Sequence, residues 1–356
     1  MIKALIVDDS AVMRQHIKHV LEADSGIQVI GMSENGLDAV NFVQENKPDI
    51  VTMDINMPKM NGHEATRRIM ETTPVPIVIV TASYEKNDVE KSFLAMEAGA
   101  LAIVEKPFGL GHAGYDSTAK DLVDTVKIMA EVKVIRRWPA KRISQITETQ
   151  ENGVPRIDVF RAHCGLIAIG ASTGGPPVLQ TILAGLGKKL PVPVVVVQHI
   201  SKGFVDGLID WLKLSTGLDI HAASHNERLQ PGHVYFAPDD CHMGVRSDGR
   251  LQLSKEPPEN GLRPSVSYLF RSALTAYSTN VVAVLLTGMG KDGAEELKLL
   301  KDIGAVTIAQ DKESSVVYGM PGEAVRLDAA SYVLTPEKIS HALVSFAAQA
   351  TRRTDA

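Results

Sequence analysis

The chain has 356 residues, of which 44% are hydrophobic and 22% charged, and its formal net charge is −5. This length favours two domains, because domains usually run to ~100–200 residues. The composition excludes wholesale disorder. The mildly acidic balance argues against a protein whose main task is to hold a nucleic-acid backbone, so we expect no DNA binding.

Two further sequence features concern the compartment. No stretch approaches the ~20 apolar residues that span a bilayer. The first nine residues become acidic too early for a signal peptide. Two cysteines are too few for a disulfide framework. The sequence therefore predicts a cytoplasmic protein without membrane insertion.

The first 108 residues alternate short apolar runs with helical patterns. The runs cover residues 4–7, 27–32, 50–53, 77–81 and 102–104. Parallel strands need a crossover and usually use a helix, so this rhythm predicts βα units around a parallel sheet. Five such units indicate a flavodoxin-like (βα)5 domain, in which function sits at the carboxyl ends of the strands.

Polar residues stand where these strands should end. Asp8 and Asp9 follow the first run and Asp54 the third, while Thr81 and Lys106 follow the fourth and fifth. Converging carboxylates repel one another unless a hard cation such as Mg²⁺ binds between them. Lys106 and Thr81 would then bind a phosphoryl group. Any one acid could equally begin a turn or cap a helix, but the five together favour a site.

Residues 1–108 resemble the receiver domain of response regulators, chiefly through DINMPKMNG at 54–62 and KPF at 106–108. The resemblance implies that Asp54 accepts phosphate from a histidine kinase. It also implies a Mg²⁺ site formed by three carboxylates and one backbone carbonyl, those of Asp8, Asp9, Asp54 and Asn56. Many receivers carry an aromatic switch residue three positions before the lysine, whereas this chain has Ile103 there, so signalling by aromatic rotation is doubtful.

The periodic pattern decays after residue 109. Between residues 131 and 142 there are five basic residues against one acid. We interpret this stretch as a solvated linker; contact with acidic partners is the alternative. We expect a receiver domain at 1–125, a linker at 126–160 and a catalytic domain at 161–350.

A second α/β pattern begins at residue 166. Further apolar runs cover 192–198, 234–237, 281–287 and 305–309. Near-continuous Val, Ile and Leu are typical of strands covered on both faces. The sequence therefore predicts a second doubly wound, mainly parallel α/β domain.

The clearest motif of the second half is GASTGGP at 170–176, directly after an apolar strand. It fits Gly-x-Ser-x-Gly, which places a serine, here Ser172, on a tight strand-to-helix turn. A helix beginning near Pro176 would direct free N–H groups at developing negative charge. A cradle for phosphate and a plain turn remain alternatives for this motif.

A nucleophilic serine needs a base. His199 ends the Val-rich strand, although a single histidine there is more often structural. Asp292 lies in the loop TGMGKDGA after another strand. Ser172, His199 and Asp292 would then be nucleophile, base and orienter. Their order differs from the Ser…Asp…His order of α/β-hydrolases, so the motif does not predict that fold.

Residues 166 to about 334 resemble the chemotaxis protein-glutamate methylesterase family, known as CheB. The shared pieces are GASTGG, QH, PGHVY, AP, HM, RPSV, TGMGKDGA and GMP. The resemblance implies hydrolysis of glutamate γ-methyl esters on the cytoplasmic helices of a chemoreceptor, with release of methanol and with deamidation of receptor glutamines as a second reaction. It implies no cofactor for the esterase, and a receiver that covers the catalytic cleft until it is phosphorylated.

In that family setting, N–H groups near Thr173 and Met289 would bind the oxyanion. Three positions depart from the family pattern. Ser267 stands where an acid is common, and Asp239 and Asp240 stand where glycines are usual. We expect these changes to affect receptor preference more than chemistry.

Other interpretations stay open at this point. A phosphorylation-dependent DNA-binding regulator is disfavoured, because the second half is not basic and shows no compact helix-turn-helix. A catalytically silent receptor-binding scaffold is a further alternative. His221 and His225, four residues apart, suggest a metal site, but no acid or cysteine is convincingly spaced beside them. We interpret these two, with His233 and His242, as surface or cleft histidines.

Overall fold

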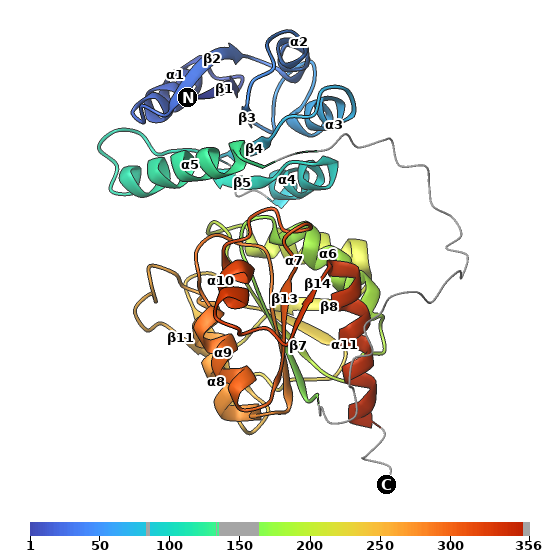
Figure 1. Cartoon of the computed structure of the whole chain (residues 1–356). Coiled ribbons are helices and arrows are strands. Elements are labelled where there is room, and N and C mark those ends of the chain that lie inside the picture. Colours follow the sequence, from blue (N-terminus) through green and yellow to red (C-terminus); the bar gives the residue numbers. More distant parts are fainter. Residues whose placement is uncertain (83–85, 133, 135–163, 352–356) are drawn as a thin grey trace, which may run out of the picture. The chain divides into compact units, whose positions relative to one another are not determined.

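The computed structural model describes residues 1–82, 86–132, 134 and 164–351. The chain divides into two compact units, Met1–Thr149 and Gln150–Ala356 (Figure 1). All five basic residues of the 131–142 cluster, and most of the expected linker, lie outside the described residues.

The first unit contains a five-stranded parallel sheet in the order β2-β1-β3-β4-β5. This is the flavodoxin-like order, as predicted. Each strand overlaps one predicted apolar run; β3 and β4 are buried along their whole length, whereas β2 and β5 are only partly buried. The strands are β1 (Ile2–Val7), β2 (Ile27–Ser33), β3 (Ile50–Met53), β4 (Ile77–Thr81) and β5 (Ala102–Glu105).

Five helices accompany this sheet (Figure 1): α1 (Ala11–Glu22), α2 (Gly36–Asn46), α3 (Gly62–Thr72), α4 (Lys86–Ala98) and α5 (Tyr115–Ala130). Helices α2, α3 and α4 pack in sequence against one another, and α1 packs against α5. Short polar side chains begin several of them; Ser10 and Asn61, for example, accept N–H groups of α1 and α3. Helix α5 continues past the boundary expected at residue 125, because Val126 and Met129 belong to its buried face.

The second unit contains seven parallel strands in the order β14-β13-β12-β6-β7-β9-β8. They are β6 (Leu166–Ala171), β7 (Val194–Gln198), β8 (Asp219–Ala222), β9 (His233–Phe236), β12 (Val281–Leu285), β13 (Val306–Gln310) and β14 (Tyr332–Leu334). A separate antiparallel pair joins β10 (His242–Val245) to β11 (Leu251–Ser254). The predicted doubly wound sheet is thus confirmed, and all seven of its strands are parallel.

Six helices cover this sheet: α6 (Gly175–Leu186), α7 (Val205–Thr216), α8 (Val266–Tyr277), α9 (Ala294–Asp302), α10 (Met320–Arg326) and α11 (Pro336–Thr351). Helix α6 packs against both α7 and α11, and α9 packs against both α8 and α10. Strands β6, β7 and β12 are buried along their whole length between these helices.

Both sheets have a topological switch point, where consecutive connections leave in opposite directions. In the first sheet it lies between β1 and β3. In the second, the chain runs outward from β6 through β7 to the edge and returns with β12 on the other side of β6. Open α/β sheets bind ligands beside the carboxyl ends of the strands at such points. The order of strands therefore directs attention to the residues after β1 and β3, and after β6, β7 and β12.

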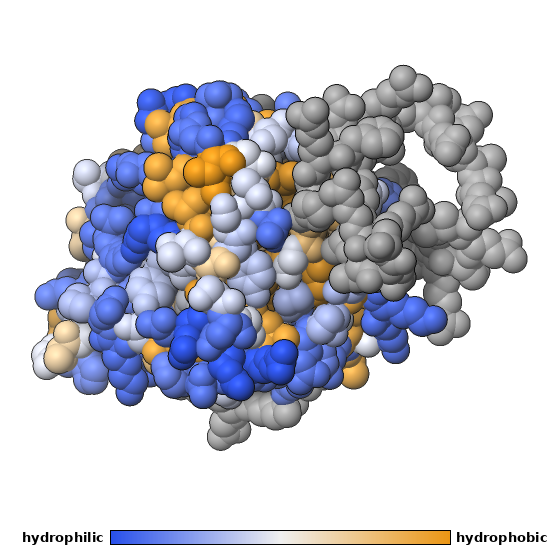
Figure 2. Space-filling model, turned by 90° about the horizontal axis from the view of Figure 1, so that it is seen from below, coloured by the Kyte–Doolittle hydropathy of each residue, from blue (hydrophilic) through white to orange (hydrophobic). Residues whose placement is uncertain are grey.

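Hydrophilic residues cover most of the face shown in Figure 2, with smaller hydrophobic areas among them. Scattered apolar side chains on a surface are normal for folded chains. Within the described ranges, no helix combines the length and the apolar character needed to cross a membrane.

Candidate active site and phosphoacceptor site

Three carboxylates meet at the switch point of the first sheet. Asp8 and Asp9 follow β1 and Asp54 follows β3, and one oxygen of each lies within 4.8 Å of the others. Asp8 and Asp54 are buried, whereas Asp9 is exposed. Three oxygen donors at this spacing suit a hard divalent cation such as Mg²⁺.

Lys106, which follows β5, reaches into this cluster. Its Nζ lies 2.7 Å from Asp8 Oδ2 and 3.1 Å from Asp54 Oδ2. Burial has the largest effect on the pKa of Asp54. Together with the nearby charge of Asp8 it raises this pKa to about 6, although the charge of Lys106 acts in the opposite direction. Burial would lower the pKa of Lys106, but the two carboxylates outweigh it and raise that pKa. The cluster therefore keeps an excess of negative charge that a cation would neutralise.

The remaining predicted receiver residues lie around the acids. The side chain of Asn56 accepts a hydrogen bond from Lys91 Nζ (2.9 Å). Its backbone carbonyl accepts none from any described residue, so that oxygen is available as a ligand. Thr81 is buried at the end of β4. Ile103 is partly buried and packs against the hydrophobic core of this unit, where it fills space as an aliphatic side chain.

Ser172 lies on a tight turn between β6 and α6. Its N–H donates to the Thr287 carbonyl (3.0 Å), and its own carbonyl accepts from Gly175 N–H (2.8 Å). Gly174, with φ of 78°, makes the turn possible because the left-handed region disfavours residues with a Cβ. The Ser172 side chain keeps a small exposed surface, 9% for the residue.

His199 lies beside Ser172. Ala171 pairs with Gln198 in the parallel register of β6 and β7, so the next residues of the two strands are neighbours, and His199 N–H donates to the Ala171 carbonyl (2.9 Å). No hydrogen bond joins the Ser172 hydroxyl to the His199 ring among the described residues. Catalytic contacts of this kind are often long in a free enzyme and tighten when substrate binds.

Asp292, from the loop after β12, contacts the same imidazole. Its Oδ2 lies 3.0 Å from His199 Nε2, although the ring N–H does not point along that line and forms no in-line hydrogen bond. The other ring nitrogen, Nδ1, has no hydrogen-bond partner in the described parts of the chain. The structure therefore brings Ser172, His199 and Asp292 together at the carboxyl ends of three adjacent strands, β6, β7 and β12.

The start of helix α8 surrounds the Asp292 carboxylate. It accepts hydrogen bonds from the Ser265 hydroxyl (3.0 Å) and from the N–H groups of Val266 (2.7 Å) and Ser267 (3.0 Å). Burial, the largest single influence, would raise the pKa of Asp292. Contact with His199 and the donors of α8 outweigh it and hold that pKa well below the usual range. Asp292 thus stays ionised and its orientation is fixed.

Ser267 belongs to this support. The residue is 7% exposed; its hydroxyl donates to Glu296 (2.6 Å) and accepts the N–H of Gly293 (2.9 Å). Arg271 in turn donates to Glu296 (2.8 Å). We expected Ser267 on a substrate-contact loop, but the structure buries it beneath Asp292. The Ser267 hydroxyl thus links Glu296 to the turn that carries Asp292.

Two backbone N–H groups near Ser172 are free to bind an oxyanion. Neither Thr173 nor Met289 donates its N–H to any described residue. The loop that carries Met289 is fixed, because the Gly288 carbonyl accepts N–H groups from Gly319 (3.1 Å) and Met320 (2.9 Å). A Cβ on Gly288 would lie 2.6 Å from the Ser172 Cβ, so the close approach of the two loops requires glycine.

Comparisons with known proteins identify the family of this chain. The chain is 52% identical, over 98% of its length and 99% of the relative, to a protein of Syntrophus aciditrophicus (strain SB) named "Protein-glutamate methylesterase/protein-glutamine glutaminase 1". Residues 167–343 match the CheB methylesterase family, and residues 4–112 match the response regulator receiver domain. The chain belongs to the CheB methylesterase family.

Other similar proteins include a Geobacter metallireducens relative with the same activity name, also 52% identical over 98% of this chain and 99% of that protein. Among solved structures, the CheB methylesterase catalytic domain of Thermotoga maritima is 39% identical; it covers 51% of this chain and 97% of that one, with a TM-score of 0.49.

Sequence reasoning treated Gln198 as part of a CheB-family motif without giving it a role. Its Nε2 donates to the carbonyls of Ser172 (2.7 Å) and His199 (2.8 Å). One buried amide therefore connects the turn that carries Ser172 to the loop that carries His199. Its place in the Gln-His pair at a strand end was the signal, but a backbone-binding role becomes visible only when the two loops meet.

Asp239 and Asp240, where the CheB family usually has glycine, follow β9. Asp239 accepts the N–H of Gly203 (2.7 Å), and Asp240 forms an ion pair with Lys202 (2.5 Å). Both partners belong to the loop after β7, which also carries His199. These acids therefore join two loops on the carboxyl side of the sheet.

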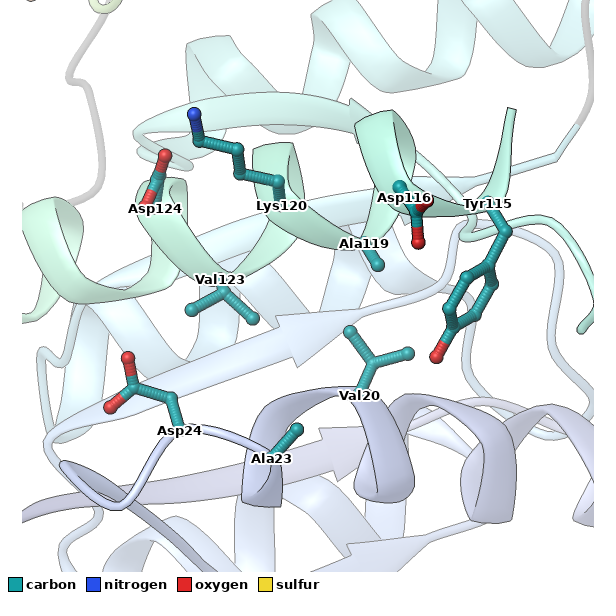
Figure 3. A pocket seen from close by; sticks show the side chains of 9 residues that line it. All are labelled: Val20, Ala23, Asp24, Tyr115, Asp116, Ala119, Lys120, Val123 and Asp124. Atoms are coloured by element: carbon teal, nitrogen blue, oxygen red, sulfur yellow. The ribbon is translucent and has the colours of Figure 1, made fainter. Parts of the chain in front are cut away.

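A shallow groove of about 340 Å³ lies between α1 and α5 in the receiver unit (Figure 3). Val20 and Val123 form its apolar floor, and an ion pair between Asp24 and Lys127 (2.8 Å) lies nearby. None of the predicted site residues lines it.

Proposed function

We propose that Ser172, His199 and Asp292 perform the methylesterase reaction of this CheB-family chain. Family membership makes the protein a phosphorylation-regulated hydrolase of chemotaxis adaptation, and its relatives are named for both methylesterase and glutaminase activity. The observation that carries the assignment is the 3.0 Å contact between His199 and Asp292, directly beside Ser172 at the switch point of the second sheet.

The reaction begins when Ser172 Oγ attacks the carbonyl carbon of a glutamate γ-methyl ester. The His199 nitrogen that does not face Asp292 takes the hydroxyl proton and passes it to the leaving methoxide, which departs as methanol. Water then attacks the acyl-enzyme, His199 takes its proton and returns it to Ser172 Oγ, and a glutamate carboxyl group is left on the receptor. Asp292 stays ionised and stabilises the imidazolium that forms twice.

The oxyanion of each tetrahedral intermediate would lie between the N–H groups of Thr173 and Met289. Both donors are unoccupied by protein acceptors in the described residues. A preorganised donor of this kind contributes about 3–4 kcal/mol to transition-state stabilisation.

The receiver unit supplies the control. Receiver domains bind Mg²⁺ for phosphorylation, and the donor set of Asp8, Asp9, Asp54 and the Asn56 carbonyl fits that ion. Bound there, Mg²⁺ would neutralise the acids as a phosphoryl group approaches. Asp54 would accept this group from a histidine kinase, and Lys106 and Thr81 would bind its oxygens. The proposal puts the chain in the cytoplasm, with the kinase and the cytoplasmic helices of a chemoreceptor as partners.

The test is methanol release from methylated receptor membranes. Ser172→Ala should abolish it, because the variant lacks the nucleophile, while phosphorylation of Asp54 continues. Ser215→Ala, an exposed serine of α7, is the matched control and should retain full activity. Near wild-type methanol release by Ser172→Ala would overturn the assignment.

Deamidation of receptor glutamines is the second activity that the relatives' names support. The same attack by Ser172 would release ammonia in place of methanol. Ammonia release that persists in Ser172→Ala would separate this activity from the proposed site.

A further inference from the structure

A second cluster of polar side chains lies on the edge of the catalytic sheet, away from the triad. Asp219 and His221 come from β8, the edge strand, and His233 comes from its neighbour β9. Asp219 pairs with His233 in the parallel register. Asp219 and His233 begin their strands, whereas His199 follows the carboxyl end of β7. The cluster is therefore at the opposite end of the strands from the active site.

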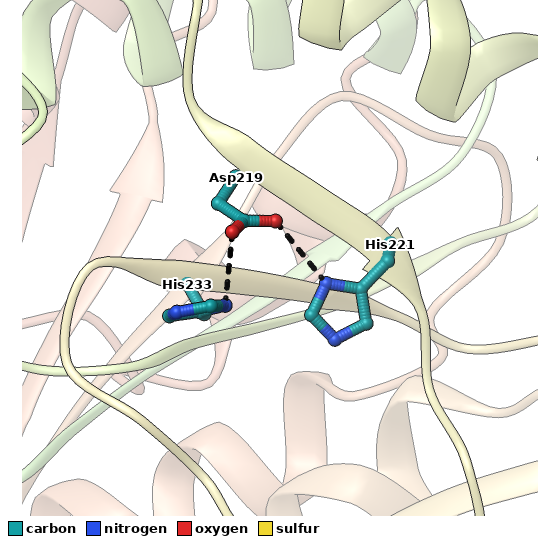
Figure 4. Close-up of side chains that lie close together, drawn as sticks. All are labelled: Asp219, His221 and His233. Carbon is teal, nitrogen blue, oxygen red and sulfur yellow. Dashed lines mark ion pairs between the residues drawn. The ribbon is translucent and has the colours of Figure 1, made fainter.

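The three side chains face one another (Figure 4). Asp219 Oδ1 lies 3.6 Å from His221 Nδ1, and Asp219 Oδ2 lies 3.5 Å from His233 Nδ1. One ligand atom from each residue lies within 4.8 Å of the others. Ligands at Zn–N and Zn–O distances of ~2.0–2.1 Å in a tetrahedron are ~3.3–3.4 Å apart. Binding a zinc ion would draw the three ligand atoms, now within 4.8 Å of one another, closer together by at most about 1.5 Å.

Two details distinguish this cluster from an ordinary pair of surface ion pairs. His233 Nδ1 is buried and has no hydrogen-bond partner, so a lone pair or proton points into the cluster without an acceptor or donor. His221 Nε2 contacts Glu227 Oε1 at 2.8 Å, and the other Glu227 oxygen accepts Ser224 N–H (2.9 Å). A carboxylate that fixes the outer nitrogen of a histidine leaves the inner nitrogen directed at a metal.

We propose that Asp219, His221 and His233 bind a zinc ion. Two imidazole nitrogens and one carboxylate oxygen are ligands that Zn²⁺ prefers, whereas Mg²⁺ and Ca²⁺ prefer oxygen alone. The Asp219 side chain is 62% exposed, which leaves the fourth position open to water. The ion cross-links edge strand β8 to β9. Our sequence reasoning missed the acid because it stands two residues before His221, on the same face of a strand, a spacing that becomes significant only once His233 is opposite.

The other histidines considered for metal binding are not part of the cluster. His225 Nδ1 contacts the Leu253 backbone, and the ring of the buried His242 stacks on Tyr268. His225 is exposed and only four residues from His221. It therefore offers a matched control for adventitious binding of zinc to surface imidazole.

The experiment is a zinc titration of the metal-free full-length chain against a competing chromophoric chelator, with excess Mg²⁺ present to occupy the receiver carboxylates. Wild type should bind one zinc ion per chain, and its thermal midpoint should rise with zinc. Asp219→Asn and His221→Gln should remove this binding and the rise. Glu227→Gln should lower the affinity for zinc about 10–100-fold. His225→Gln should behave as wild type.

Because Asp219 is exposed and asparagine keeps its size, Asp219→Asn tests the site without threatening the fold. The proposal is overturned if wild type and Asp219→Asn bind zinc with equal affinity. It is also overturned if His225→Gln loses zinc binding to the same extent as His221→Gln. Binding of Cu²⁺ or Ni²⁺ without binding of zinc would overturn the assignment to zinc. Since the site lies apart from the triad, methanol release by Asp219→Asn should equal that of the wild type, and loss of zinc with intact esterase activity leaves the proposed function untouched.

Discussion

A single carboxylate, that of Asp292, links the His199 ring to the start of helix α8. It contacts His199 and accepts three hydrogen bonds from Ser265, Val266 and Ser267. Contact with His199 stabilises the Asp292 charge most, and the donors at the start of α8 add to it. The carboxylate is therefore held from two sides.

Replacing this charge should affect chemistry more than folding. Asp292→Asn keeps the size of the side chain, but its amide cannot stabilise the imidazolium, so we expect kcat for methanol release to fall about 10³–10⁴-fold with little change in KM. Asp302→Asn, on the exposed end of α9, is the control. A loss below tenfold would show that His199 works without this partner.

The raised pKa of Asp54 predicts how the stability of the receiver unit depends on pH. Burial raises its pKa from 3.8 to about 6 in the metal-free chain. The folded state therefore holds this proton more tightly than the unfolded state, and stability falls as pH rises from 3.8 to about 6. Above that window the full cost of the buried charge, about 3 kcal/mol, is present.

Asp54→Asn removes this cost. In chelator, the free energy of unfolding of the variant minus that of the wild type should grow with pH, by about 3 kcal/mol in total between pH well below 3.8 and pH well above 6, and level off beyond that window. Denaturant unfolding of the receiver unit at several pH values measures it. Saturating Mg²⁺ should stabilise the wild type and not the variant. A difference that does not change with pH would contradict the burial argument.

At the scale of an element, helix α6 begins directly after the turn that contains Ser172 and ends at an exposed glycine, Gly187. Gly174 precedes it with φ of 78°, and Gly187 follows it with φ of 72°. A Cβ on Gly174 would lie 2.5 Å from Val316 Cβ, whereas a Cβ on Gly187 would meet nothing within 4 Å. Both glycines have a positive φ, but they differ in ψ (−1° at Gly174 and 158° at Gly187) and in their surroundings.

These two positions form a matched pair. Each change to alanine should destabilise the chain by about 1–3 kcal/mol, because both positions have a positive φ that residues with a Cβ rarely adopt. Gly174→Ala must also push Val316 or the Ser172 turn aside, so its methanol release should fall roughly 10–100-fold, as for a small displacement of a catalytic group. Gly187→Ala should keep wild-type activity per folded molecule. Equal activity losses in the two variants would show that the turn tolerates displacement.

The elements also show what sequence reasoning can reach. β7 was predicted because four consecutive valines are typical of a buried strand. β8 was missed, because its sequence Asp-Ile-His-Ala has the polar residues of an edge strand. The triad was predicted since each member follows a recognisable strand, but the α8 donors to Asp292 were not. They precede it by 25 to 27 residues, and only the packing of α8 beside the β12 loop brings them together.

At the scale of the whole molecule, a phosphoacceptor unit and a hydrolase unit share one chain, and family membership makes the first a regulator of the second. Phosphorylation regulates the esterase only if the phosphorylated and unphosphorylated receivers interact with the catalytic unit with different free energies. Each tenfold change in activity requires about 1.4 kcal/mol of such a difference.

If the unphosphorylated receiver restrains the esterase, a small-molecule phosphodonor with Mg²⁺ should raise methanol release by the full chain, and Asp54→Asn should not respond. Deleting residues 1–145 should raise basal release, because the restraint is removed, and should abolish the response to phosphodonor. Circular dichroism and reaction with a serine-directed ester reagent show whether the shortened chain is folded with an accessible Ser172. A folded, reagent-reactive fragment that is no more active than the unphosphorylated full chain would contradict restraint, and would mean that the phosphorylated receiver acts instead as a positive element of the active enzyme.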